Sequence, residues 1–429
     1  MKASSMCSNQ INQLAGFILD LHLSIFVLLM LQYSSETFLN RVVEGWSGAK
    51  GPENPTCKVI KRSTRSRRNS PESWTVSFSF FFASSFCSFS CFAMLLSSLV
   101  LSALSLVSVT AQNVVQATQD TWDLINYAEH LSSLAICGEP YGVIYKPFQC
   151  AGRCSDFPDM ELITQFTPQD PLDFSVSGFL AVDHKRKVFW HVFRGTATLN
   201  NGLTDLRIKR QPLTSWNTAK MDCPDCQVHV GFLQAYNLAY SEAKGAMDDT
   251  FAKYPDYQVI VTGHSLGGAA TFLHGINLKT SGYDPLVITS GQPLTGNKAL
   301  ADYNDKLFFG DNPDFTHQGP DRRFYRVTHK EDIVPRIPFW TPYHQSGGEV
   351  YIDFPGINPP VNTLKVCDGQ QNPLCSFSTS LASTATQGIV EAAHLIYFTF
   401  FFLCSTLLYP PLNSDLPAGV WGKPLNGTI

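Results

Sequence analysis

The order of apolar and polar positions predicts strands and a helix in the second half of the chain. Residues 257–263 form a β-branched run bounded by charged and Pro-containing sequence, which predicts a buried strand. Small and apolar residues follow at 269–280 and predict a helix. Runs at 188–194 and 323–329 predict further strands. A strand that leads directly into a helix is typical of α/β proteins.

The N-terminal part of the chain has a different pattern. An apolar stretch at 16–31 is interrupted by Asp20 and His22 and is shorter than the ~20 residues that a membrane helix requires, so it is a weak transmembrane candidate. Residues 73–119 contain no charged side chain, and the Phe- and Ser-rich run at 77–92 has no helical or alternating periodicity.

Residues 94–111 predict a secretory signal peptide, because a short apolar region ends in the small residues that signal peptidase requires. The usual positively charged start is missing. A signal peptide belongs at the beginning of a protein, so we interpret Met94 as the true first residue and residues 1–93 as an over-extended gene model. The alternative is that residues 1–93 are translated and anchor the protein in a membrane.

Composition narrows the class of protein. The 429 residues allow two or three small domains or one large α/β domain with additions, and the 44% apolar fraction excludes a mainly disordered chain. Lys and Arg number 31 against 35 Asp and Glu, a net charge of −4, so the basic surplus expected of a nucleic-acid-binding protein is missing. The dense basic cluster at 58–68 lies in the N-terminal leader.

An even number of cysteines follows the signal peptide and favours disulfides in an oxidising compartment. The simplest pairing joins Cys150 with Cys154, Cys223 with Cys226 and Cys367 with Cys375, and leaves Cys137 to pair with Cys404. Two alternatives remain open: a redox motif at 223–226, and a zinc site formed by the second to fifth cysteines. The eight residues are Cys137, Cys150, Cys154, Cys223, Cys226, Cys367, Cys375 and Cys404.

The segment between the strand at 257–263 and the helix at 269–280 reads Gly-His-Ser-Leu-Gly-Gly. A G-x-S-x-G motif between strand and helix is the signature of a nucleophile elbow, in which the serine lies on a strained turn with its hydroxyl exposed. Only small residues two positions to either side allow the strand and the helix to approach so closely. Ser265 is therefore the candidate nucleophile.

A serine hydroxyl needs a base to take its proton, and the base needs an acid to fix its tautomer. In the elbow architecture the chain order is Ser, then Asp or Glu, then His. Asp332 follows the strand at 323–329, with Glu331 as the neighbouring alternative. Of the later histidines, His394 comes after a plausible helix and is the candidate base. The other three are His317, His329 and His344.

Acyl transfer also needs hydrogen-bond donors for the developing oxyanion. The amide of Leu266, directly after the nucleophile, is one donor by architecture. The second is expected from the loop after the strand at 188–194, where Thr196 offers an amide and a hydroxyl. On its own, this loop would be read as an ordinary turn.

Five ordered motifs between residues 115 and 405 resemble the fungal-type class 3 triacylglycerol lipases, and their spacing is most similar to that of the secreted yeast lipases. The motifs are FRGT at 193–196, VHVGF at 228–232, VTGHSLGGA at 261–269, HKEDIVPRIP at 329–338 and AHLIYF at 393–398.

The resemblance implies an α/β-hydrolase fold: a mostly parallel central sheet flanked by helices in a single catalytic domain, at residues 112–404, with a short lid at 197–207. It implies secreted hydrolysis of triacylglycerols at an oil–water interface by Ser265, Asp332 and His394, with Thr196 and Leu266 as the oxyanion hole. The chemistry requires no cofactor and no metal. Nucleic acid is not expected as a partner, and no obligate protein partner is evident.

More than one interpretation remains open for the C-terminal end of the chain and for the substrate. Residues 405–429 form a tail beyond the resemblance, with one acceptor for N-glycosylation at Asn426. The apolar run at 397–408 is either a packed end segment or an artefact of the gene model. A feruloyl-type esterase on the same fold, a membrane-tethered phospholipase or lipase of an internal compartment, and a non-catalytic lipid-binding protein are the rival functions.

Overall fold

The computed structural model describes residues 113–136, 144–150, 153–168, 175–195, 209–213, 215–216, 219–338, 342–378 and 390–401. The chain divides into two units, Met1–Ser97 and Ser98–Ile429. The first unit, and with it the expected leader, lies outside the described residues, as do the expected signal peptide and tail. The described residues all belong to the second unit.

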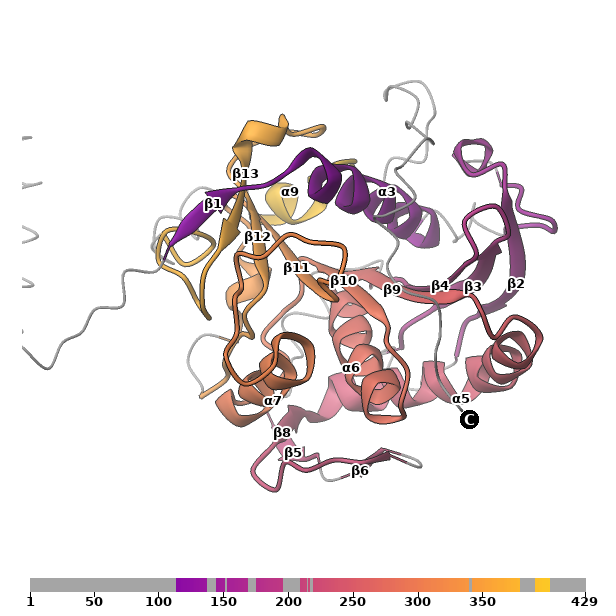
Figure 1. Ribbon diagram of the computed structural model, residues 1–429, viewed down its shortest axis with the longest axis horizontal. Helices are drawn as coiled ribbons and strands as arrows, with labels where there is room; N and C mark the ends of the chain where they lie inside the picture. Colours follow the sequence, from indigo (N-terminus) through magenta and orange to yellow (C-terminus); the bar gives the residue numbers. More distant parts are fainter. Residues whose placement is uncertain are drawn as a thin grey trace, which may run out of the picture. The chain divides into compact units, whose positions relative to one another are not determined.

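A nine-stranded sheet forms the centre of this unit (Figure 1). Its five middle strands are parallel, whereas two strands at each edge pair in antiparallel fashion. In spatial order the strands are β1 (Val114–Gln116), β13 (Leu364–Cys367), β12 (Glu349–Ile352), β11 (Phe324–His329), β10 (Leu286–Ser290), β9 (Gln258–His264), β4 (Val188–Phe193), β3 (Gly178–Asp183) and β2 (Met160–Phe166).

Helices cover both faces of the sheet. Helices α3 (Gln119–Ile136) and α9 (Val390–Leu395) lie on one face, and α5 (Val230–Lys253), α6 (Leu266–Thr280) and α7 (Lys298–Phe309) lie on the other (Figure 1). The middle strands are buried along their whole length, which explains the mainly apolar sequences of β4, β9 and β10.

Alternate residues of several strands enter two different apolar cores. In β4, Phe189 and Phe193 pack with α5 and α6, while Trp190 and Val192 pack with α3. Helix boundaries follow local chemistry as well: the Asn297 side chain accepts a hydrogen bond from the Leu300 amide at the start of α7.

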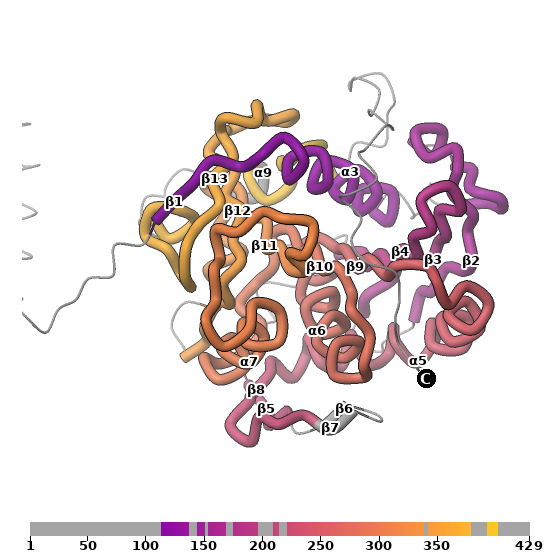
Figure 2. Tube along the Cα trace, in the orientation of Figure 1, coloured from indigo at the N-terminus to yellow at the C-terminus, as the bar shows by residue number. Residues whose placement is uncertain are grey.

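The ends of the described chain lie side by side. Figure 2 shows β1 and α3 running next to β13 and α9. The indole Nε1 of Trp122 donates to the carbonyl of Pro359, and its ring lies 5.3 Å from that of Phe398, measured between centroids. Residues 397–401 are mostly buried, so this beginning of the apolar run at 397–408 is packed; the rest of the run is outside the described residues.

Smaller elements complete the unit. Two two-stranded sheets pair β5 (Arg210–Pro212) with β8 (Gln227–His229), and β6 (Ser215–Trp216) with β7 (Ala219–Lys220). Three short 3-10 helices are η1 (Cys154–Asp156), η2 (Val334–Arg336) and η3 (Val361–Thr363). Within the described ranges, no helix has both the length and the apolar character needed to cross a bilayer.

Three of the four expected disulfides are present: Cys150–Cys154, Cys223–Cys226 and Cys367–Cys375. Because the sulfur atoms of Cys150, Cys154, Cys223 and Cys226 are paired, these residues do not offer the four thiolates of a zinc site. The remaining expected pair, Cys137 with Cys404, lies outside the described residues.

Candidate active site

The nucleophile elbow has the geometry expected from its sequence. Ser265 is the single residue between β9 and α6, with φ 60° and ψ −125°. A non-glycine residue with positive φ is strained, and it persists only where its surroundings impose it. Its amide donates to the carbonyl of Ser290 at the end of β10, at 2.9 Å. This turn presents the serine at the carboxyl edge of the parallel strands.

The two glycines of the motif are required by close packing. A Cβ on Gly263 would lie 2.6 Å from the carbonyl oxygen of Gly267, and a Cβ on Gly267 would lie 2.4 Å from the carbonyl oxygen of Phe193. Real Cβ atoms essentially never come under 3.0 Å. Larger residues at either position would push the strand and the helix apart.

Asp332 and His394 come together although 62 residues separate them. The Nδ1–H of His394 donates to Oδ2 of Asp332 at 2.9 Å, and the amide of Val334 donates to Oδ1 at 2.9 Å. Both side chains are almost completely buried. This hydrogen bond fixes the proton on Nδ1 and leaves Nε2 as the basic nitrogen. Nε2 has no hydrogen-bond partner among the described residues, so its lone pair is available.

Tyr397 is a third donor to the Asp332 carboxylate, and sequence reasoning did not identify it. Its hydroxyl donates to Oδ2 of Asp332 at 2.6 Å. Burial, and then the neighbouring Asp332, raise the pKa of Tyr397 well above its ordinary value, so the hydroxyl stays protonated. Its place three residues after His394, in the AHLIYF motif, was the available signal, although the contact itself depends on how residues 390–401 pack.

His264 holds the backbone of His394. Its Nε2 bonds the carbonyl oxygen of His394 at 2.8 Å, and its ring stacks on Phe401 with 3.9 Å between centroids. Burial, together with the nearby His394, holds the pKa of His264 well below its ordinary value. His264 is therefore a neutral donor that fixes the backbone carrying the base.

The oxyanion donors are described in part. Leu266 is the first residue of α6, so its amide has no acceptor within the helix. Thr196 and the expected lid at 197–207 lie outside the described residues. The residue before Thr196 is described: a Cβ on Gly195 would lie 2.8 Å from the His264 carbonyl oxygen and 3.0 Å from the Ser265 Cβ. The segment directly after β4 therefore lies against Ser265.

The remaining histidine and acid candidates have other surroundings, although His329 lies near the Asp332–His394 pair: its ring is 5.4 Å from that of Tyr397, between centroids. His329 is the last residue of β11 and is buried, and burial lowers its pKa. His317 is exposed and bonds Asp321 at 2.6 Å, while His344 pairs with Gly296 in an isolated bridge. Glu331 has positive φ, and of the two neighbouring acids it is Asp332 that bonds the base.

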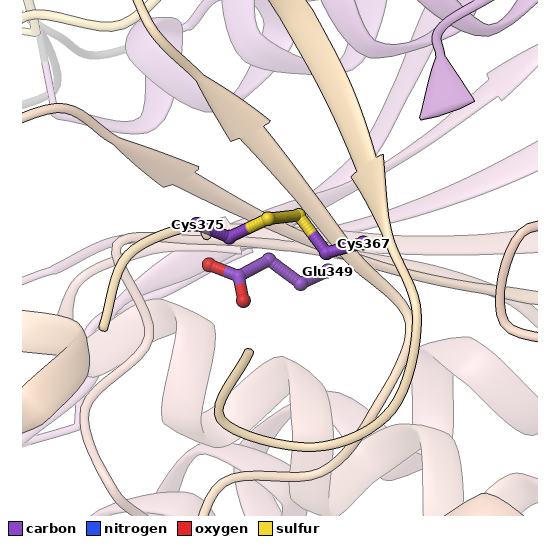
Figure 3. A group of neighbouring side chains, drawn as sticks. All are labelled: Glu349, Cys367 and Cys375. Atoms are coloured by element: carbon purple, nitrogen blue, oxygen red, sulfur yellow. A yellow bond between two sulfur atoms is a disulfide. The ribbon is translucent and has the colours of Figure 1, made fainter. Parts of the chain in front are cut away.

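One group of metal-ligating residue types occurs in the described ranges, away from Ser265: Glu349, Cys367 and Cys375 (Figure 3). The two sulfur atoms are bonded to each other, so neither is a thiolate. The carboxylate of Glu349 accepts from Arg326 at 3.1 Å and from the Thr328 hydroxyl at 2.6 Å. These atoms are already engaged in a buried ion pair and a disulfide.

Comparisons with known proteins show which family the chain resembles. A family model described as "Lipase (class 3)" matches residues 190–341. Secreted mono- and diacylglycerol lipase 2 of Gibberella zeae is 34% identical over 57% of this chain; the aligned region spans 65% of that relative, less than two thirds of its length.

Two solved structures extend the similarity. The Lip2 lipase of Yarrowia lipolytica is 42% identical, with a TM-score of 0.63 over 68% of this chain and 98% of the other. A triacylglycerol lipase whose catalytic centre is described as a serine protease triad is 26% identical, with a TM-score of 0.54 over 68% of this chain and all of the other. These matches confirm the expected α/β-hydrolase fold.

Proposed function

Because this chain belongs to the class 3 lipase family, whose members hydrolyse carboxylic esters, we propose that it cleaves the ester bonds of triacylglycerols through an acyl-serine intermediate. Ser265 is the nucleophile, His394 the general base and Asp332 the acid that orients it. The observation that carries this proposal is the Asp332–His394 hydrogen bond, which leaves Nε2 of a buried imidazole without a partner among the described residues, near the strained Ser265 turn.

Each step of the reaction has a group to perform it. Ser265 Oγ attacks the ester carbonyl while His394 Nε2 accepts its proton, and Asp332 stabilises the imidazolium that forms. The tetrahedral oxyanion receives hydrogen bonds from the amides of Leu266 and Thr196. His394 then protonates the departing alcohol, and a water molecule activated by the same nitrogen hydrolyses the acyl-serine.

Triacylglycerol is the substrate class favoured by the motif resemblance and by the triacylglycerol lipase of similar fold. A second candidate is mono- and diacylglycerol, because the Gibberella zeae relative carries that name. A lid at residues 197–207 would cover an apolar acyl groove in water and open at a lipid surface.

We also propose that the protein is secreted. Two relatives are named secreted lipases, and three disulfides among the described residues suit an oxidising compartment. Cell fractionation of the native source tests this: activity should be found in the medium, on a chain that begins at Gln112. Activity that stays with membranes, on a chain containing residues 1–93, would favour the membrane-tethered alternative.

A series of esters tests the proposed activity and substrate class. The purified protein is expected to hydrolyse emulsified long-chain triacylglycerols, and Ser265→Ala should lower the rate by at least about 10⁴-fold, since the nucleophile and the base act as a unit. Ser281→Ala is the matched control, because this exposed serine lies at the other end of α6. Preference for soluble aromatic esters, or for mono- and diacylglycerols over triacylglycerols, would overturn the substrate assignment.

A further inference from the structure

Helix α3 carries a buried acid that the proposed mechanism does not use. Glu129 is fully buried, and its Oε1 accepts a hydrogen bond from the hydroxyl of Ser290. Its Oε2 has no hydrogen-bond partner among the described residues. Burial raises the pKa of Glu129 to about 8, so the group is a neutral acid at pH 7. Burial of a carboxyl group whose hydrogen bonds are only partly satisfied costs stability, so its presence here calls for a functional explanation.

Ser290 lies between the turn that carries Ser265 and the proposed base, His394. Its carbonyl oxygen accepts from the Ser265 amide at 2.9 Å, and by strand register it pairs with His264. The next residue, Gly291, has φ 57°, and a Cβ there would lie 2.8 Å from His394 Cε1 and 3.0 Å from the Tyr397 hydroxyl. A shift of this turn would therefore move the nucleophile relative to the imidazole.

We propose that Glu129 is a positioning residue. By holding the Ser290 side chain, it fixes the turn at 290–291, and this turn positions the Ser265 amide and the His394 ring relative to each other. The inference rests on the proposed ester hydrolysis. Glu129 touches neither substrate nor reacting atoms and acts only through Ser290. The helix is itself anchored to the sheet one turn further on, where the hydroxyls of Ser132 and Thr262 are hydrogen-bonded at 2.9 Å.

The surroundings of Glu129 predict that turnover depends on pH. Near this turn, titratable groups are carried by β9 (His264), by β11 (His329), by the segment after β11 (Asp332) and by residues 390–401 (His394 and Tyr397). The charge of Glu129 acts on Tyr397, which itself bonds Asp332. Among the described residues no cation is paired with Glu129. Its ionisation at alkaline pH should therefore disturb the turn and lower turnover.

The experiment compares Glu129→Ala, Glu129→Gln and the control Ser132→Ala in the full chain, with p-nitrophenyl butyrate as substrate between pH 6 and 10. At pH 7 we expect Glu129→Ala to lower kcat by about tenfold with KM unchanged, since small misplacements of reacting groups are costly. Glu129→Gln keeps an acceptor for Ser290 and should retain kcat within about twofold. We expect kcat of the unsubstituted protein to decline above pH 8, and Glu129→Gln should lack this decline.

The control separates positioning from packing. Ser132→Ala also removes a hydrogen bond between α3 and the sheet, but it leaves Ser290 untouched, so kcat should not change. Equal losses of kcat in Glu129→Ala and Ser132→Ala, or an alkaline decline that persists in Glu129→Gln, would overturn the inference. If Glu129→Ala does not fold, Ser290→Ala takes its place with the same expected loss of kcat. An unsubstituted protein that cleaves no ester would instead refute the proposed function, and the inference with it.

Discussion

At the scale of single residues, the site depends on how each polar group of the proposed triad is held. Asp332 receives three hydrogen bonds, from His394, Tyr397 and the Val334 amide, in surroundings from which water is excluded. Hydrogen bonds to a buried charged group are stronger than those between neutral groups. The carboxylate is therefore fixed in position before any substrate binds, and it fixes the imidazole in turn.

Tyr397→Phe tests this arrangement. The variant removes one of the two donors to Oδ2 of Asp332, and we expect kcat to fall by about tenfold, since a hydrogen bond to a charged group is worth about 1.5–3 kcal/mol. KM should stay unchanged, because Tyr397 is buried behind the base. The matched control is Tyr236→Phe, whose buried hydroxyl bonds His274 and Asn277 on α6. A kcat equal to that of the control would contradict this role.

At the scale of elements, the contact between α6 and the sheet contains an unusual pair of histidines. The rings of His191 on β4 and His274 on α6 lie 4.3 Å apart between centroids, and both are buried. Burial lowers the pKa of His274 to about 3 and holds the pKa of His191 well below its ordinary value. Both rings are therefore neutral in the folded protein near pH 7.

This pair should make the fold sensitive to acid. In the unfolded chain each ring takes up a proton below pH 6.5, whereas the folded chain does not until far lower pH. Stability is therefore complete above pH 6.5 and decreases as pH falls from 6.5 towards 3. The measurement is the free energy of unfolding in urea of His191→Leu minus that of the unsubstituted protein. We expect this difference to rise by about 2–3 kcal/mol when the pH is lowered from 7 to 4.5. A difference that is the same at both values would contradict this expectation.

At the scale of the whole molecule, the sequence predicted most of what is local. The strand at 257–263, the elbow and the helix after it occur as β9, Ser265 and α6, because positive φ and tight packing demand particular residues at fixed spacing. The strands at 188–194 and 323–329 occur as β4 and β11. Three disulfides between neighbouring cysteines were also within reach of sequence reasoning, since short loops close readily.

Contacts between distant segments could not be predicted in the same way. Glu129 precedes Ser290 by 161 residues, and the Tyr397 hydroxyl meets Asp332 across 65. No spacing rule connects such positions. They meet because α3 and residues 390–401 pack on the same face of the sheet, and that packing results from the whole set of buried side chains.

The central claim is that Ser265 forms the covalent acyl intermediate, and the most direct test is to label it. A p-nitrophenyl alkylphosphonate mimics the tetrahedral intermediate and should react with the purified protein in a one-to-one ratio, abolishing hydrolysis. Peptide mass spectrometry should place the phosphonyl group on Ser265, and Ser265→Ala should remain unlabelled. Label on another residue with full loss of activity, or undiminished ester hydrolysis by a protein labelled at Ser265, would contradict the mechanism.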